Sequence, residues 1–533
     1  MTIPNKIFYV TTPIYYVNDA PHIGHVYTTT AADALARFKR IDGYDVFFLT
    51  GTDEHGSKVE ESAKKNHEQP IELANRIVKR FQSLWQKFLI THNDFIRTTE
   101  DRHKKVVTHL IQKVIDNGDI YLGQYEDWYC VPCETFWTKT QLVETDSGTS
   151  VCPQCHREVQ KLKEESYFFK MSKYEKPLLQ YINDHPLFIQ PESKKNEIVS
   201  FIKEGLRDLS ISRATVKWGI PMPHTGETKH SHIIYIWFDA LINYISALGY
   251  LDNPKQYKKY WPEALHIIGK DILRHHAIYW STFLMSLGLP LPKRIYAHGW
   301  WTNEGKKMSK SLNNFVDAET LVQKFNIHVD VFRYFVLREI PFGSDGDFSE
   351  KAFIQRVNSD LANDFGNLLN RTLTMVLKYQ NGKVTKPKSS LETDLDRGVR
   401  EKFEKSTLEF SFFMDKLAFH QALEKLWEAI RATNKYLDTS APWTLAKDEK
   451  NKEKLNLVLA YTLEGLRVSS ILVSCVMPHA AAEALSSLGI KDFSCGTQKE
   501  QGLQELCAWW KDRKELSVTK IPPLFPKLEE KPS

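Results

Sequence analysis

The spacing of apolar residues predicts that the first 60 residues form a strand, a helix and a second strand. Residues 6–12 are mostly β-branched or aromatic and end at Pro13, a pattern typical of a buried strand. Residues 26–40 carry apolar or small side chains at helical spacing, so a helix is expected there. Residues 44–56 read as a second buried strand that ends in a polar loop.

The same alternation continues further along the chain. Residues 58–90 and 101–117 have amphipathic helical spacing, and Asn117-Gly118 is a signal for a helix end. Residues 231–248 begin as a strand and continue as a helix. Residues 265–271 form another strand and loop before a further helix. The first half is therefore predicted to be an α/β domain.

Beyond residue 346 or so the strand pattern stops and long helices are expected. Two breaks interrupt them, the polar loop 380–392 and the Ala441-Pro442 step. The tail 521–533 is rich in proline and charge and is expected on the surface or disordered. The expected helices span roughly 350–380, 393–437, 450–477 and 497–514.

The composition limits the class of protein and its possible partners but does not indicate a function. The 533 residues are 42% hydrophobic and 26% charged, as in an ordinary globular protein with several domains. A net charge of +5 permits a nucleic-acid partner but does not argue for one. With no signal peptide before the first strand and no apolar run long enough for a bilayer, we expect no membrane partner and a cytoplasmic protein.

Four cysteines form two C-x-x-C pairs. Cys130 and Cys133 are followed, after a spacer of suitable length, by Cys152 and Cys155, with a hairpin expected over residues 138–150. This is the spacing of a tetrahedral Zn²⁺ site. Four thiolates would fill the coordination shell, so we predict one structural zinc ion per chain.

The first candidate for chemistry is His22-Ile23-Gly24-His25, at the junction between the first strand and helix. Helix N-termini bind phosphate, and Gly24 lets a ligand approach the backbone closely. Taken alone, two histidines that merely cap a helix explain this motif at least as well. Asp53, at the end of the second strand, could bind an ammonium group or act as a turn or cap residue.

The second candidate is Lys307-Met308-Ser309-Lys310-Ser311, which follows a strand over 294–299. Two lysines on a loop suit a triphosphate, although such loops are commonly just solvated surface. The pair of motifs, in this order and context, resembles the signatures of the class I aminoacyl-tRNA synthetases. Further motifs narrow the resemblance to the methionyl-tRNA synthetases; they lie at 13–16, 51–56, 237–240, 269–272, 342–349, 367–371 and 441–443 and in the four cysteines.

The resemblance implies an α/β Rossmann-type catalytic domain with a zinc-knuckle insertion, followed by an all-α helical bundle. The implied activity is ATP-dependent formation of methionyl-adenylate from L-methionine, then transfer to tRNA(Met), initiator tRNA included. The expected domains are catalytic first half 1–117, insertion 118–215, catalytic second half 216–295, stem-contact region 296–345, anticodon-binding helices 346–520 and tail 521–533. Because no further domain follows the bundle, a monomer is expected.

Residue roles also follow from the resemblance. His22, His25, Lys307 and Lys310 are the expected catalytic contacts, and Gly24 and Ser309 join them in binding ATP, which enters with Mg²⁺. Asp53 is expected to bind the methionine α-ammonium. The methionine side chain would contact Ile14, Tyr16, Trp237, Ala240, Leu241, Tyr244, Ile272 and His276. His275 and Ser281 depart from the family pattern, which leaves the packing of this pocket open.

The anticodon is expected to contact the helical half. Trp443, after Pro442 at a helix break, could project from the surface or pack in the bundle core. The resemblance favours stacking on an anticodon base, with Asn367 and Arg371 as the base-reading pair on one helix face. The alternatives are another class I synthetase, a small adenylyltransferase with the same histidine motif, and a non-catalytic tRNA-binding paralogue.

Overall fold

The computed structural model of the chain describes residues 6–18, 21–133, 135–137, 139–145, 148–223, 228, 230–303, 306–307, 317–491, 493, 502–511 and 513–529. Its centre is a six-stranded sheet in the order β3-β2-β1-β13-β14-β9, in which every neighbouring pair is parallel. The strands span Ile7–Tyr16 (β1), Asp45–Asp53 (β2), Asp94–Arg97 (β3), Ile189–Gln190 (β9), Ala264–Gly269 (β13) and Arg294–His298 (β14). The predicted Rossmann-type sheet is confirmed.

β1 lies between the two halves of this sheet and is the place where the strand order reverses. The chain moves from β1 to β2 and β3 on one side, whereas β13 pairs with the other edge of β1. Ligands bind beyond the carboxyl ends of parallel strands at such a point. The α-helices of this half span Ile23–Ile41 (α1), Ser57–Lys65 (α2), Pro70–Lys87 (α3), Asp101–Asp116 (α4), Glu175–Asp184 (α5), Glu192–Lys203 (α6), Ile236–Leu241 (α7), Asn243–Ser246 (α8), Pro254–Tyr260 (α9) and Ser281–Leu287 (α10).

Two predicted boundaries in this half are wrong. The first strand does not stop at Pro13 but continues to Tyr16, with a register shift between Thr11 and Ile14. A proline is tolerated at such an irregularity because no ladder hydrogen bond is required there. The single helix expected over 58–90 is two, because Pro70 has no N–H to donate and therefore begins α3.

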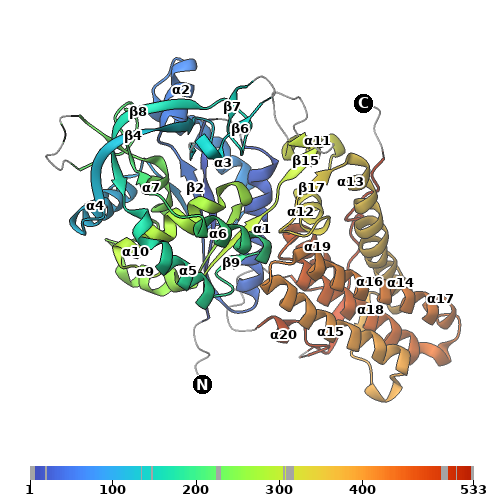
Figure 1. Cartoon of the computed structure of the whole chain (residues 1–533). Helices are drawn as coiled ribbons and strands as arrows, with labels where there is room; N and C mark the ends of the chain where they lie inside the picture. Colours follow the sequence, from blue (N-terminus) through green and yellow to red (C-terminus); the bar gives the residue numbers. More distant parts are fainter. Residues whose placement is uncertain are drawn as a thin grey trace.

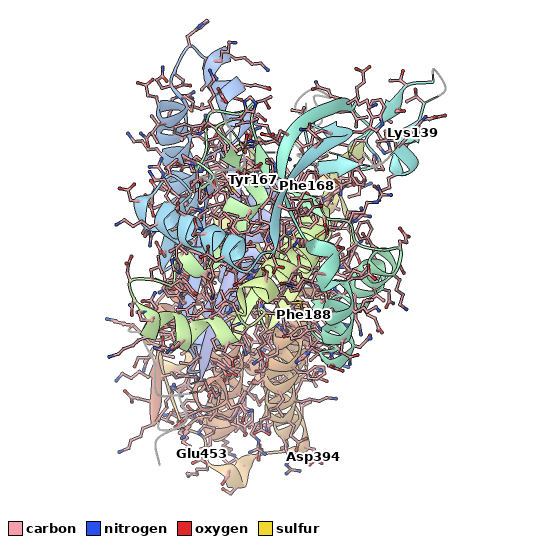
Figure 2. The ribbon with its side chains drawn as sticks, turned by 60° about the vertical axis from the view of Figure 1, so that its left-hand side comes forward. Lys139, Tyr167, Phe168, Phe188, Asp394 and Glu453 are labelled. Atoms are coloured by element: carbon pink, nitrogen blue, oxygen red, sulfur yellow. The ribbon has the colours of Figure 1, made fainter. Side chains whose placement is uncertain are left out.

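An antiparallel sheet stands beside the catalytic sheet and carries the cysteine pairs (Figure 1). It is built from Ile120–Cys130 (β4), Thr135–Trp137 (β5), Gln160–Phe169 (β8) and Leu209–Ser210 (β10). The predicted hairpin between the cysteine pairs is present as Val143–Glu144 (β6) and Ser150–Val151 (β7). Lys139, in this insertion, lies at the opposite end of the molecule from Asp394 and Glu453 of the helical half (Figure 2).

The second half is a helical bundle, as predicted. After Ala318–Phe325 (α11) and Val329–Arg338 (α12), one long helix runs through Glu350–Arg356 (α13), a π-helical segment Val357–Gly366 and Asn367–Gln380 (α14). The remaining helices are Asp394–Asp415 (α15), Phe419–Ser440 (α16), Pro442–Leu445 (α17), Lys452–Val473 (α18), Pro478–Ser487 (α19) and Leu503–Leu506 (α20).

Several helix and strand predictions for this half need correction. The helix expected over 393–437 is divided at Leu417, which has a φ of 57°. The helix expected over 450–477 is confirmed as α18, and Pro478 begins α19. Of the helix expected over 497–514, the described residues contain only α20. Short strands also persist beyond 345, at Gly346–Phe348 (β17), Lys383–Thr385 (β18) and Glu515–Ser517 (β19). Three residues are too few to produce a recognisable alternation.

One helix, within Glu449–Val473, is long and apolar enough to cross a membrane by length and composition. In the structure 94% of its apolar window is buried inside the bundle. Its apolar surface is therefore covered by the neighbouring helices of the same chain.

A buried arginine joins the two halves. Arg333 of α12 is fully buried, and its Nη2 donates to Oδ2 of Asp33 in the middle of α1 at 2.7 Å. Its Nη1 donates to the Phe88 carbonyl at 2.9 Å, at the end of α3. Its Nε donates to the Val476 carbonyl at 2.8 Å, in the link between α18 and α19. One guanidinium thus binds two elements of the catalytic half and one of the helical half.

We predict that Arg333→Leu lowers the free energy of unfolding by about 3–5 kcal/mol, because Asp33 would keep a buried charge with one of its cationic partners removed. Chemical denaturation followed by circular dichroism measures this. Arg397→Leu is the matched control, since Arg397 pairs with an Asp394 side chain that is 98% exposed, and its midpoint should stay at the wild-type value. A wild-type midpoint for Arg333→Leu would contradict the assigned role.

Candidate active site

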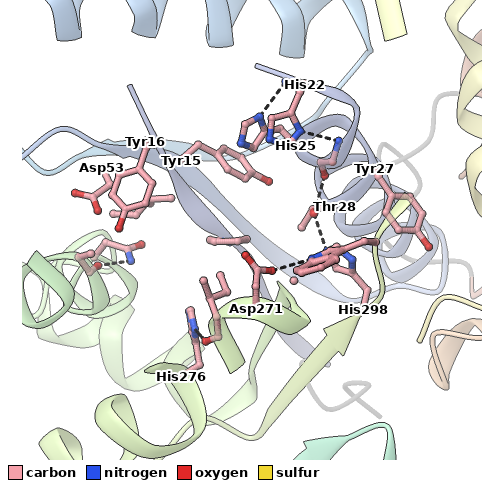
Figure 3. Close-up of a pocket in the computed structure, with 18 of the residues that line it drawn as sticks. Tyr15, Tyr16, His22, His25, Tyr27, Thr28, Asp53, Asp271, His276 and His298 are labelled. Carbon is pink, nitrogen blue, oxygen red and sulfur yellow. Dashed lines mark hydrogen bonds between the residues drawn. The ribbon is translucent and has the colours of Figure 1, made fainter. Parts of the chain in front are cut away.

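A cavity of about 310 Å³ opens at the carboxyl ends of β1, β2, β13 and β14 (Figure 3). Residues from distant parts of the sequence meet in its wall. Every residue predicted to contact methionine lines it, as do three of the residues predicted to contact ATP. These are Ile14, Tyr16, His22, Gly24, His25, Asp53, Trp237, Ala240, Leu241, Tyr244, Ile272 and His276.

The start of α1 is capped by the two motif histidines. Nδ1 of His22 accepts the N–H of Gly24 at 3.0 Å, and Nδ1 of His25 accepts the N–H of His22 at 3.0 Å. The two rings stack with their centroids 3.7 Å apart. Because each Nδ1 accepts a backbone hydrogen, each ring carries its own proton on Nε2. Capping therefore leaves two Nε2–H donors at a helix N-terminus.

Electrostatics keep His25 uncharged. Burial lowers the pKa of His25 well below its usual value, and the neighbouring His22 lowers it further. At neutral pH His25 therefore acts as a neutral hydrogen-bond donor rather than as a cation.

Gly24 is needed for a reason that the sequence did not reveal. A Cβ built on Gly24 would lie 2.9 Å from Cε1 and 3.0 Å from Nδ1 of His22. These separations are shorter than real Cβ contacts, so a side chain at Gly24 would push the His22 ring away. The absence of a side chain at Gly24 therefore leaves space for the imidazole of His22.

The other end of the cavity is apolar and contains neutral polar groups. Nδ1 of His276 donates to the Ile272 carbonyl at 2.9 Å, which leaves Nε2 to accept the Tyr244 hydroxyl hydrogen at 2.7 Å. Burial lowers the pKa of His276 to about 4, so the ring is neutral at pH 7. The Trp237 indole forms another wall and stacks on His275 at 3.8 Å, with 19° between the ring planes. His275, a departure from the family, therefore backs the pocket without lining it.

Asp53 ends β2 and is 3% exposed at the edge of the cavity. Its position is tied to the apolar wall through a buried network. Nδ1 of His55 and Nε2 of His103 lie 2.6 and 2.8 Å from the two carboxylate oxygens of Asp239. Burial would raise the pKa of Asp239, but His55 and His103 outweigh it and lower the value to about 2. Since Asp239 lies on α7 with Trp237, the loop after β2 and this helix are held together.

The four paired cysteines converge. Sγ of Cys130 is 3.5 Å from Sγ of Cys155, and Sγ of Cys152 is 3.9 Å from Sγ of Cys133. All four sulfur atoms lie within 4.8 Å of one another. Ligands 2.3 Å from a tetrahedral Zn²⁺ ion would be separated by about 3.8 Å, so the cluster fits a Cys₄ metal site.

The lysine loop is described only in part. Lys307 belongs to a short strand, Lys306–Lys307 (β16), whose backbone pairs with Trp301–Asn303 (β15). Ser309 and Lys310, with Met308 and Ser311, lie outside the described residues. β15 follows directly after the cavity residues Gly299 and Trp300.

The predicted anticodon residues gather around the ends of α14 and α16. Asn367 and Arg371 lie one turn apart on α14, and Nη2 of Arg371 pairs with Oδ1 of Asp438 at 2.6 Å. Asp438 is close in sequence to the break at Ala441, after which Pro442 begins α17. Trp443 is 40% exposed. It is therefore not a residue of the bundle core, which was the alternative interpretation of this position.

Sequence reasoning missed several residues of the site. His298 and Thr28 join β14 to α1, with Nε2 of His298 2.7 Å from the Thr28 hydroxyl. Asp271 lines the cavity and accepts the indole N–H of Trp300 at 3.1 Å. His55, His103 and Asp239 form the buried network. His55, Asp239 and Asp271 lie within the stretches 51–56, 237–240 and 269–272 that carry the family resemblance, but no role was predicted for them.

Two family descriptions match the chain. "tRNA synthetases class I (M)" matches residues 8–164 and 158–373, and "Anticodon binding domain of methionyl tRNA ligase" matches residues 386–530. Their order agrees with the α/β half and the helical half of the structure.

Individual relatives of the chain support the same family assignment. A methionine–tRNA ligase from Caldanaerobacter subterraneus is 50% identical over 489 residues, covering 91% of this chain and 74% of that protein. The Bacillus subtilis methionine–tRNA ligase is 45% identical over 538 residues, covering 98% and 78%. Methionyl-tRNA synthetase of Mycobacterium tuberculosis, solved in complex with methionyl-adenylate, is 40% identical with a TM-score of 0.90, covering 98% of this chain and 100% of that one. The chain belongs to the methionyl-tRNA synthetases, within the class I tRNA synthetases.

Proposed function

We propose that this chain activates L-methionine in the cavity at the carboxyl ends of β1, β2, β13 and β14. The methionine carboxylate attacks the α-phosphorus of ATP, the bond to the leaving diphosphate breaks, and methionyl-adenylate forms. A hydroxyl of the terminal adenosine of tRNA(Met) then attacks the methionyl carbonyl, and AMP leaves. One observation carries the proposal: a single cavity of about 310 Å³ joins a helix N-terminus bearing two imidazole donors to a buried carboxylate and an apolar wall.

The ATP end is the start of α1. The Nε2–H groups of His22 and His25 would donate hydrogen bonds to the phosphates. The positive end of the helix dipole would attract the phosphate charge. Such fixed donors stabilise charge that develops on the leaving diphosphate without any group having to move. Lys307 and Lys310 would bring positive charge to the same phosphates, and Mg²⁺ bound with ATP would neutralise them further. No general base is required, because a carboxylate is already a nucleophile.

The methionine end is the apolar wall. Asp53 would bind the α-ammonium group, and Trp237, Leu241 and Ile272 would contact the thioether side chain. His276 and Tyr244 already satisfy each other by a hydrogen bond, so they present little unpaired polarity to an apolar substrate. The His55–Asp239–His103 network positions Asp53 and Trp237 relative to each other but touches no reacting atom.

The anticodon would contact the surface formed by Asn367, Arg371 and Trp443, for elongator and initiator tRNA alike. Pro442, predicted with them, is buried and would only position Trp443. The cysteine cluster would hold one structural Zn²⁺ ion, since four thiolates leave no coordination position for chemistry. Because a reducing compartment keeps cysteine thiols available as zinc ligands, we expect the chain to act in the cytoplasm.

Pyrophosphate exchange with each amino acid in turn tests the proposal. We predict that exchange is strongest with methionine and that norleucine is discriminated by only about 1–3 kcal/mol, because an apolar pocket distinguishes similar side chains weakly. Strongest exchange with isoleucine or leucine would point to another class I synthetase. Binding of tRNA without any exchange would point to a non-catalytic paralogue.

Gly24→Ala should lower the exchange rate by about 10²-fold or more, because the added Cβ displaces the His22 ring and removes a donor to the phosphates. Methionine affinity measured without ATP should stay near wild type. Gly398→Ala is the control, since no atom lies within 4 Å of a Cβ at that position of α15. A Gly24→Ala chain with normal exchange would remove His22 from the proposed mechanism.

Trp443→Ala should weaken aminoacylation of tRNA(Met) by about 1–3 kcal/mol, the usual contribution of one base stack. Exchange should remain at the wild-type rate, because adenylation takes place in the other half of the chain. Leu408→Ala, which removes an exposed apolar side chain from α15, should change neither. If Trp443→Ala lowers exchange and melting temperature together with charging, the residue is structural.

A further inference from the structure

Three metal-binding side chains meet where α12 contacts α19, outside the cavity and the cysteine cluster. One nitrogen or oxygen atom from each of His328, Asp330 and His479 lies within 4.8 Å of the others. Nδ1 of His328 is 3.6 Å from Oδ2 of Asp330, and the two imidazole rings stack at 4.0 Å. His328 caps α12, and His479 is in the first turn of α19.

Asp330 differs from the two histidines of this cluster because its carboxylate is buried. It is fully buried, and Oδ2 accepts the N–H of Ala480 at 2.8 Å. Oδ1 forms no hydrogen bond with any residue that the structure describes. Burial of a carboxylate oxygen without a partner is costly, and here burial raises the pKa of Asp330. A cation bound by this carboxylate would offset part of the cost of burying it.

We infer that His328, Asp330 and His479 bind a divalent transition-metal ion of the zinc, cobalt and nickel class. Two imidazoles and one carboxylate suit these ions, whereas Mg²⁺ and Ca²⁺ prefer oxygen ligands only. Burial lowers the pKa of His328, which keeps this ring neutral and able to bind. The histidine side chains are 40% and 48% exposed, so water can complete the coordination shell.

Neighbouring groups agree with this assignment. Oε1 of Glu483 is 3.7 Å from Nε2 of His479, which resembles the carboxylate–imidazole pairing that orients metal-binding histidines. Because the rings are stacked, at least one must rotate about its Cβ–Cγ bond before both face one ion. Their exposure leaves room for that rotation.

The ion would link two helices, α12 and α19, beside the junction between the two halves of the chain. α12 carries Arg333, which already binds α1 and the link between α18 and α19. A metal held by residues of α12 and α19 would cross-link the same junction. Binding should therefore stabilise the folded chain by an amount that rises with the logarithm of the free ion concentration above the dissociation constant.

The test uses the full chain without a histidine tag, loaded with one equivalent of Zn²⁺, which the four thiolates bind in preference to imidazoles. This protein is titrated with Ni²⁺ by calorimetry. We expect one saturable nickel site per chain and a rise in melting temperature, with the zinc content unchanged at one ion by elemental analysis. His479→Gln and His328→Asn should each weaken nickel binding about tenfold or more and abolish the rise. Asparagine at position 328 can still cap α12. His185→Gln, at an exposed histidine elsewhere, should behave as wild type.

Two results would overturn the inference. One is the absence of saturable nickel binding to the zinc-loaded chain. The other is nickel binding that the two site variants leave unchanged, which would mean adventitious binding by surface histidines only. Neither result affects the proposed function, because methionine-dependent exchange takes place in a different cavity and is measured separately.

Discussion

The buried ion pair between Arg333 and Asp33 is the constraint on which the arrangement of the two halves depends. Both side chains are fully buried, so each charge is costly when one of its partners is removed. The remaining donors of the guanidinium are used by backbone carbonyls from α3 and from the α18–α19 link. A planar, rigid donor group of this kind fixes the direction from which each element approaches.

Asp33 lies on the helix that begins at the proposed ATP site. It also accepts hydrogen bonds from Arg37 and from the backbone of Thr91, so α1 is fastened at its centre from several sides. The N-terminus of the same helix presents the imidazoles of His22 and His25. The position of these donors in the cavity therefore depends on packing contacts far from any substrate.

Helix capping and ligand binding are not alternatives at this site. Capping uses Nδ1 of each motif histidine and so places the exchangeable proton on Nε2. The helix needs the acceptors and a phosphate needs the donors, and one tautomer serves both. At the apolar end of the cavity the polar groups are likewise satisfied within the protein. His276 and Tyr244 form a hydrogen bond with each other, and His275 packs behind Trp237.

The sequence by itself determined the fold class, the cysteine cluster and twelve of the 24 residues that line the cavity, because strand periodicity, C-x-x-C spacing and the motif pair are local patterns. It did not determine that the stretches 58–90 and 393–437 are each divided into two helices, at Pro70 and at Leu417, since amphipathic spacing continues across these breaks. Only the tertiary structure decided that His55 and His103 meet Asp239, and that Arg333 meets Asp33. These partners are 184, 136 and 300 positions apart. No local pattern encodes such pairings, because a buried polar group is satisfied by whichever partner the completed fold brings within hydrogen-bonding distance.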